Sequence, residues 1–262
     1  MNLPRPIGIV AIFGLGLILS GCAAATPSES ARPSPTPVPS AAPTSSSAAS
    51  IQDIMALEPL GPIEAGTYFI DPDGDTSTPL RVVYEVPAEG WSEWIGAAKF
   101  SDVGHVGVSI TTVSNLVTDG CTDHSWADPP VGPGVADLAA AMTVLAPFEV
   151  TSKPSDVTAF GYSGKHVAWT VPDLPVGGTA GNDHRFNKCI GGDLKSWVAF
   201  VDTAEPGDAF YGYTGPGYTE EFWILDVDGT RLMIAAETSA GSPAEDIAER
   251  DRILDSIVIE PS

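Results

Sequence analysis

The chain has little positive charge. It carries 12 Lys and Arg residues against 34 Asp and Glu residues, which gives a formal net charge of −22 at pH 7. Residues 1–21 contribute only Arg5, so the rest of the chain stands at 11 − 34 = −23. A surface this acidic repels nucleic-acid phosphates and anionic lipid headgroups. The composition therefore argues against a nucleic-acid partner, whereas cation binding or plain solubility both fit it.

The sequence also lacks the spacing of the common catalytic motifs. Its histidines show no H-x-H or H-E-x-x-H pattern, so zinc is not indicated. The stretch GYSGK, residues 161–165, resembles a nucleophile elbow but has Lys165 where that motif needs glycine. A Ser-His-Asp site assembled from distant residues, for example around His124 or His166, stays open as an alternative.

The chain begins with an apolar run too short to span a bilayer permanently. Ile7–Leu19 follows a single basic residue and leads directly into Leu19-Ser20-Gly21-Cys22. This junction resembles the lipobox of bacterial lipoproteins. We therefore predict a signal peptide over residues 1–21, lipidation of Cys22, and a protein anchored to the outer face of the cell membrane. An ordinary secretory signal is the alternative.

The segment after Cys22 has few residues able to form a core. Between Ala23 and Ser50, only Glu29, Arg32 and Val38 are not Pro, Ser, Thr or Ala. Such a composition buries too little apolar surface to offset the entropy of ordering the chain. We predict a disordered tether over residues 22–54, followed by a single domain.

Residues 55–262 are long enough for one domain with a core. Alternating apolar residues, as in GHVGVSITTV (residues 104–113), predict half-buried strands. Helical spacing appears after Gly134, and Ser242-Pro243-Ala244-Glu245 predicts a capping box that opens a second helix. Strands joined by hairpins, with helices that do not alternate regularly, predict an α+β fold: a mostly antiparallel sheet with two or three packed helices.

Cysteine is scarce as well, with 3 residues in the chain. If Cys22 is lipidated, Cys121 and Cys189 remain as an even pair in an oxidising compartment. We predict a disulfide between them, and two buried free thiols are the alternative.

The stretch WILDVDGTRL contains Asp226-Val227-Asp228-Gly229-Thr230, which matches the first motif of the haloacid dehalogenase phosphatases. That family needs this motif on the first strand of a parallel sheet and a lysine downstream. Only 36 residues follow Asp226, and none of them is lysine. Asp-Gly between two apolar runs instead predicts a β-hairpin with a two-residue turn.

The stretch DPDGD suggests a calcium site. Asp71, Asp73 and Asp75 offer carboxylates at alternate positions, but the spacing departs from an EF-hand loop. We retain these residues as a candidate Ca²⁺ site, next to the simpler interpretation of a solvated turn. Beyond this candidate, no cofactor is expected.

Aromatic residues gather in FYGYTGPGYTEEFW, residues 210–223. The glycines and the proline argue against a regular strand over Tyr211–Tyr218. Several of these rings are therefore expected on a loop, and we retain Tyr211, Tyr213 and Tyr218 as candidates for a ligand-binding platform. The alternative is that these rings cover an edge of the core.

Several stretches together resemble an uncharacterised family of exported and lipid-anchored lipoproteins of actinobacteria. They are VPAEGW, CTDHSWADPPVGPGVADLAAAM, FEVTSKPSDVTAFGYSGKHVAWTVPD, WILDVDGTRLMI and AERDRILDSIVIEP, and the resemblance extends over most of residues 60–261. The resemblance implies export and anchoring, and it carries no catalytic assignment. The closing order of hairpin, helix and strand is similar to the Mog1/PsbP-like fold, a likeness of topology only.

The sequence thus predicts a tethered lipoprotein whose domain acts as a non-catalytic binding module. Its partner would be a protein of the cell envelope or a small ligand. A hydrolase with a spatially assembled site, or a surface spacer without any ligand, are the alternatives.

Overall fold

The computed structural model describes residues 51–75, 77–177, 185–199, 210–213 and 215–260. The predicted signal peptide and Cys22 lie outside the described residues, as does the tether up to residue 50. The first strand of the described residues is Gln52–Asp53, which pairs with a later strand, and Ile54 is fully buried. These residues belong to the folded unit, although the sequence analysis assigned them to the tether.

The larger sheet forms the centre of this unit, and all its pairings are antiparallel. Its strands in spatial order are β2 (Pro62–Ile63), β5 (Trp91–Trp94), β6 (Gly96–Ser101), β7 (Gly104–Asp119), β16 (Thr230–Thr238), β15 (Thr219–Val227), β10 (Tyr162–Thr170) and β9 (Glu149–Ala159). Two further strands pair with β7, namely β8 (Asp123–Trp126) and β13 (Leu194–Ala199). The last strand of this sheet, β14 (Phe210–Tyr213), pairs with β13.

A smaller sheet combines the two ends of the described chain. Its strands in order are β1 (Gln52–Asp53), β3 (Gly66–Ile70), β4 (Arg81–Val86) and β17 (Val258–Glu260), with β1 parallel to β3 and the other pairs antiparallel. The remaining short elements are η1 (Ile54–Ala56), η2 (Ile190–Gly192) and the ribbon of β11 (Val176–Gly177) and β12 (Arg185–Phe186).

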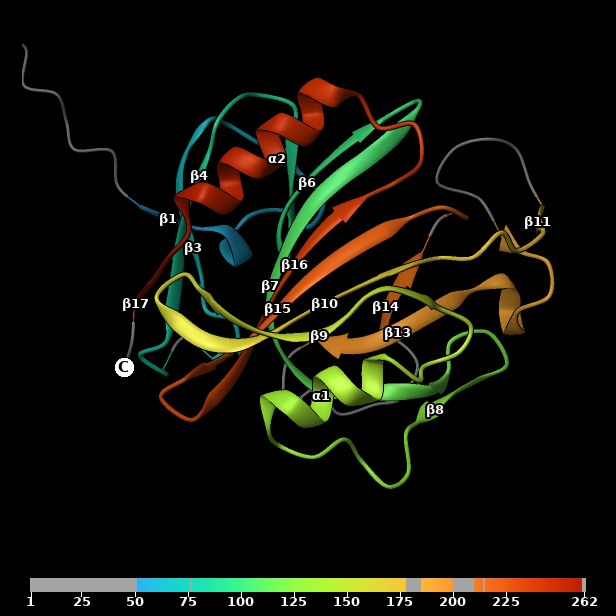
Figure 1. The fold of residues 1–262 in the computed structure, drawn as a ribbon. Coiled ribbons are helices and arrows are strands. Elements are labelled where there is room, and N and C mark those ends of the chain that lie inside the picture. Colours follow the sequence, from blue (N-terminus) through green and yellow to red (C-terminus); the bar gives the residue numbers. More distant parts are fainter. Residues whose placement is uncertain (1–50, 76, 178–184, 200–209, 214, 261–262) are drawn as a thin grey trace, which may run out of the picture. The chain divides into compact units, whose positions relative to one another are not determined.

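The α-helices of the described residues are α1 (Val135–Met142) and α2 (Ala244–Ser256). Figure 1 shows them on either side of the strands, where α1 packs on β10 and β15 and α2 packs on β4, β7 and β16. The predicted α+β class with a mostly antiparallel sheet is confirmed. Neither helix, nor any other in the part of the chain that the structure describes, is long and apolar enough to cross a membrane.

The capping box expected at the start of α2 is wrong. The N-cap residue is Pro243, which has no side chain able to cap the helix. The Ser242 hydroxyl instead donates hydrogen bonds to the carbonyls of His105 and Ser239. A tertiary contact with β7 therefore takes the hydroxyl that the local pattern assigned to the helix.

Strand alternation gives the larger sheet two buried faces. On β15, Phe222 and Ile224 belong to a core shared with α1, β13 and β14. Trp223 and Leu225, which alternate with them, face the second core, shared with α2 and the smaller sheet. The central strands are therefore covered on both sides, which explains why their sequences read as nearly continuous apolar runs.

The β15–β16 hairpin confirms the turn prediction. Asp228 and Gly229 both have positive φ, at 51° and 92°. The Gly229 amide also donates a hydrogen bond to the Asp226 carboxylate at 2.8 Å. Because β15 runs antiparallel to both its neighbours, Asp226 does not stand on the parallel strand that the phosphatase family requires.

Candidate functional site

The three tyrosines predicted as an exposed platform are buried. Tyr211 and Tyr213 lie on β14 and are 6% and 5% exposed, while Tyr218 precedes β15 and is 1% exposed. The loop prediction is wrong for Tyr211 and Tyr213, because Tyr-Gly-Tyr has the period of a strand, while Tyr218 lies outside the strands. Gly212 faces solvent, and both flanking rings point inward.

These rings lie against two buried carboxylates. Glu220 on β15 and Glu237 on β16 are directly opposite each other in the hairpin, and each is 1% exposed. The same cross-strand row continues to Trp169 on β10 and Gly107 on β7. A Cβ at Gly107 would lie 2.9 Å from Glu237 Oε2. Glycine at position 107 therefore leaves the space that this carboxylate fills.

Uncharged donors hold both carboxylates. Glu220 Oε2 accepts hydrogen bonds from the Tyr213 hydroxyl at 2.5 Å and from Trp169 Nε1 at 2.7 Å. The Ser109 hydroxyl donates to Glu237 Oε1, and the Tyr218 hydroxyl donates to Oε2 at 3.1 Å. Glu220 Oε1 is buried and has no hydrogen-bond partner among the described residues.

An outer ring of polar groups extends this network. The Tyr211 and Tyr218 hydroxyls are 2.9 Å apart, and Ser196 Oγ lies 2.9 Å from the Tyr213 hydroxyl. His105 Nε2 is 2.6 Å from the Tyr218 hydroxyl. Burial lowers the pKa of His105 to about 4, so this ring is neutral at pH 7 and does not balance the carboxylates.

Burial keeps protons on this cluster. It raises the pKa of Glu220 well above the ordinary value, and the neighbouring Glu237 charge raises it further. Burial also raises the pKa of Glu237, against the hydrogen bonds that favour its charged form. The Arg250 charge favours the charged form of Glu237, whereas burial and the Glu237 charge both oppose ionisation of Glu220, so we expect the pair to retain a proton at neutral pH.

A buried carboxylic acid that stays protonated can act as a hydrogen-bond donor or a general acid. That chemistry also needs access for a substrate. Neither of the two pockets described below is lined by Glu220 or Glu237. Within the described residues, we therefore interpret the pair as part of the core, where its titration affects stability.

The Asp71–Asp75 stretch does not converge on one point. Asp71 is 5% exposed and lies 3.9 Å from the Arg81 guanidinium, while burial raises its pKa. The carboxylates of Asp73 and Asp75 each accept a backbone hydrogen bond from two residues further along. No group of three or more His, Cys, Asp and Glu among the described residues could hold a metal ion. The geometry gives the calcium prediction no support.

The histidines considered for a hydrolase have other partners. His166 Nε2 lies 3.2 Å from Glu221 Oε2, and His124 Nε2 lies 2.9 Å from the Gly120 carbonyl. In the described part of the chain, no serine hydroxyl is hydrogen-bonded to either imidazole ring. The arrangement that would favour a hydrolase is not seen there.

The sulfurs of Cys121 and Cys189 lie 2.13 Å apart, at disulfide distance. Both residues border the core beneath α1. The Ile190 amide also donates a hydrogen bond to the Cys121 carbonyl at 2.8 Å. The pair thus links the region that follows β7 to the segment that leads into β13.

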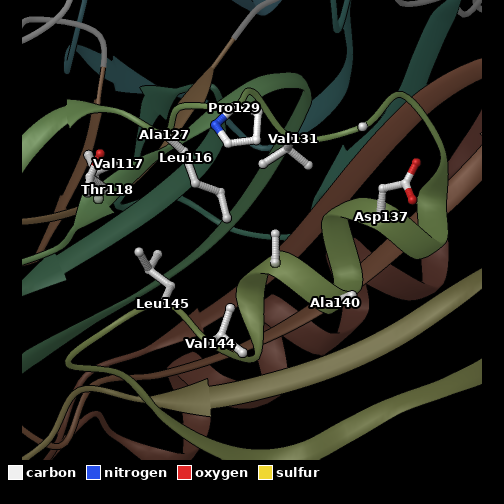
Figure 2. Close-up of a pocket in the computed structure, with 12 residues that line it drawn as sticks. Leu116, Val117, Thr118, Ala127, Pro129, Val131, Asp137, Ala140, Val144 and Leu145 are labelled. Atoms are coloured by element: carbon white, nitrogen blue, oxygen red, sulfur yellow. The ribbon is translucent and has the colours of Figure 1, made fainter.

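An apolar pocket of about 380 Å³, here called the α1 pocket, lies between α1, β7 and the loop of residues 127–134. Figure 2 shows Leu116, Pro129 and Val131 on one side and Val144 and Leu145 on the other. Its volume falls within the range of small-molecule sites. Sequence reasoning missed this pocket because its walls come from segments that are not adjacent in the chain.

Two side chains fix the loop that forms one wall of the α1 pocket. Asn115 on β7 donates a hydrogen bond to the Ala127 carbonyl at 3.1 Å and accepts one from the Val131 amide at 3.2 Å. Arg231 on β16 donates to the carbonyls of Gly132 and Gly134. These anchors preform the wall, which reduces the entropy that a ligand must overcome.

The chain matches no family model, no curated protein and no solved structure. The likeness to actinobacterial lipoproteins thus stays a prediction, and function has to be argued from the geometry.

Proposed function

We propose that this protein is a lipid-anchored extracytoplasmic lipoprotein whose domain is a non-catalytic binding module. We further propose that its α1 pocket takes a hydrocarbon group of a small ligand. The observation that carries the proposal is the pocket itself, a preformed concave site with apolar walls. The predicted lipid on Cys22 supports it, since a tethered domain stays near the lipids that carry such groups.

The polar groups at the pocket are already engaged. Asp137 Oδ2 accepts a hydrogen bond from the Gly134 amide at 2.9 Å. The Thr118 hydroxyl lies 3.1 Å from Ser125 Oγ and 3.2 Å from the Trp126 carbonyl. Few donors or acceptors are left for a ligand, so binding would rest on apolar contact. Each buried methylene contributes roughly 0.8 kcal/mol, so a chain of eight gains about 6 kcal/mol before the costs of association.

Ala141→Phe is expected to abolish the binding of a hydrocarbon probe. Ala141 lines the pocket and is partly exposed, so a larger ring would fill the space without entering the closed core. With 1-decanol, a neutral probe, the mature chain carrying Cys22→Ser should gain about 3–5 °C in melting temperature at a tenfold excess over Kd. The Ala141→Phe chain should gain nothing.

Ala136→Phe is the matched control, because Ala136 is exposed on the same helix and does not line the pocket. It should keep the full shift with 1-decanol. The proposal fails if the original chain shows no concentration-dependent shift, or if Ala141→Phe responds as strongly as Ala136→Phe.

Lipidation has its own test. Cells fed an alkynyl palmitate analogue should label the full chain, and Cys22→Ala should lose that label and leave the membrane fraction. Cys189→Ala should remain labelled, since this cysteine lies far from the predicted cleavage site. Equal labelling of the Cys22→Ala chain would reject the proposed anchor.

A further inference from the structure

A second concave site, here called the α2 cleft, lies on the other face of the larger sheet. It has a volume of about 520 Å³ and is bordered by α2, β15 and β16. Its lining includes Phe160, Glu221, Trp223, Arg250, Asp251 and Asp255. Trp223 belongs to the core on the α2 side, whereas the α1 pocket borders the opposite core. The two sites are therefore separate.

Small residues beside Glu221 help to create the cleft. Its cross-strand neighbours are Ala168 on β10 and Ala236 on β16, both of which are buried. Larger side chains at these two positions would project next to Glu221 and occupy the base of the cleft. Trp223 follows Glu221 by two residues on β15, so its side chain lies on the same face of the sheet and adds an aromatic surface to the base of the cleft.

Aromatic contacts hold the Trp223 ring in place. Phe160 meets it edge-on with ring centroids 5.9 Å apart, and the His166 ring lies 5.4 Å away on the neighbouring strand. Trp223 is half-buried, so part of it remains available to a ligand. An indole held in this way is the preferred aromatic partner of an organic cation.

The guanidinium in this lining, that of Arg250, already makes its hydrogen bonds within the protein. Arg250 donates to Asp251 Oδ1 at 2.6 Å, to the Thr238 hydroxyl, and to the Glu237 carbonyl at 3.4 Å. This side chain is 13% exposed and its charge is paired with Asp251. It is thus poorly placed to receive an anionic ligand.

The remaining charges at the cleft are negative. The Glu221 side chain is 55% exposed and contacts only His166 among the described polar groups, at 3.2 Å. Asp255 has no hydrogen bond or ion pair within the described residues. Three carboxylates and one guanidinium give the lining a formal charge of −2. The net charge of −22 on the chain adds attraction at longer range.

We propose that the α2 cleft binds a protonated amine carried on an apolar body. The apolar body would lie against Trp223 and Phe160, and the ammonium would face Glu221 and Asp255. The volume exceeds what an ammonium alone needs, which favours a ligand with such a body. The inference does not depend on the α1 pocket or on lipidation.

The test uses n-hexylammonium chloride with two probes of the same chain length, 1-hexanol and sodium hexanoate. The readout is the indole N–H signal of Trp223 in the ¹⁵N-labelled mature chain carrying Cys22→Ser, assigned by its loss in Trp223→Phe. The amine should shift this signal to saturation. The alcohol and the carboxylate should bind at least tenfold more weakly, because they lack the positive charge.

The double variant Glu221→Gln/Asp255→Asn should weaken binding of the amine at least tenfold while its melting temperature stays close to that of the parent chain. Glu149→Gln, an exposed glutamate on β9, should leave binding unchanged, and so should Ala141→Phe. Three results would overturn the proposal: no response at Trp223, equal affinity for the amine and the alcohol, or an unaltered affinity in the double variant.

Discussion

Glu220→Gln is expected to raise the free energy of unfolding at pH 8 by on the order of 2 kcal/mol, because folding at that pH must either protonate Glu220 or bury its charge with poor compensation. Glu220 is fully buried, directly opposite Glu237, and held by Tyr213 and Trp169, and no cation of the described part of the chain pairs with it. Glutamine keeps the shape of the side chain and an acceptor oxygen for those donors. It removes the group whose ionisation the folded state opposes.

The sign of the pH dependence follows from the raised pKa of Glu220. A carboxyl whose folded pKa exceeds its unfolded value of 4.5 adds stability below that value. This stability is lost as the pH rises through the folded pKa. The parent chain should therefore lose stability from about pH 4.5 upward, while Glu220→Gln should show a flatter profile over the same interval.

Urea unfolding at pH 5 and pH 8 measures the effect. Glu221→Gln is the matched control, because Glu221 is the next residue on β15 and its side chain is 55% exposed. It should change stability by less than ~0.5 kcal/mol at either pH. If Glu220→Gln proved as destabilising at pH 8 as at pH 5, Glu220 would have to be ionised and compensated in the folded state.

The second large effect concerns the disulfide. Replacing both Cys121 and Cys189 by serine should lower the free energy of unfolding by about 4 kcal/mol, as the loop-entropy relation gives for the sequence separation of 68. For a folded unit of this size, that corresponds to a fall of about 10 °C in melting temperature. Thermal unfolding of the oxidised chain with and without a reductant provides the same comparison.

Cys22→Ser supplies the control for that experiment. Cys22 precedes the described residues and belongs to the predicted tether, so the substitution should leave the melting temperature and the effect of reductant unchanged. An unchanged melting temperature in Cys121→Ser/Cys189→Ser would mean that the link adds nothing to the native contacts around it.

Local signals allowed much of the fold to be predicted. Asp228-Gly229 marked the hairpin because few residues other than glycine adopt positive φ easily, and the helical spacing after Gly134 marked α1. The predictions failed where contacts between residues far apart in the chain outweighed the local sequence pattern. Ser242 donates to His105 on β7, a partner more than a hundred residues away that no local pattern reveals.

The carboxylate pair was missed, although a signal for it was present. A two-residue turn at Asp228-Gly229 fixes the register of the hairpin, and that register places Glu220 opposite Glu237. The sequence does not indicate that this face is buried, because β13 and β14 cover it from distant parts of the chain. The same limit applies to the α1 pocket and the α2 cleft, whose walls join segments that only the fold brings together.

The way the folded unit begins has a mechanical consequence under the proposed anchoring. Any pull from the membrane would reach the domain first through β1, where Gln52 and Asp53 pair with Tyr68 and Phe69. Separating these two residues from β3 would lengthen the tether by roughly 7 Å. Only then would force reach Ile54, which is fully buried in the core on the α2 side, so the loss of β1 pairing would precede any strain on this core.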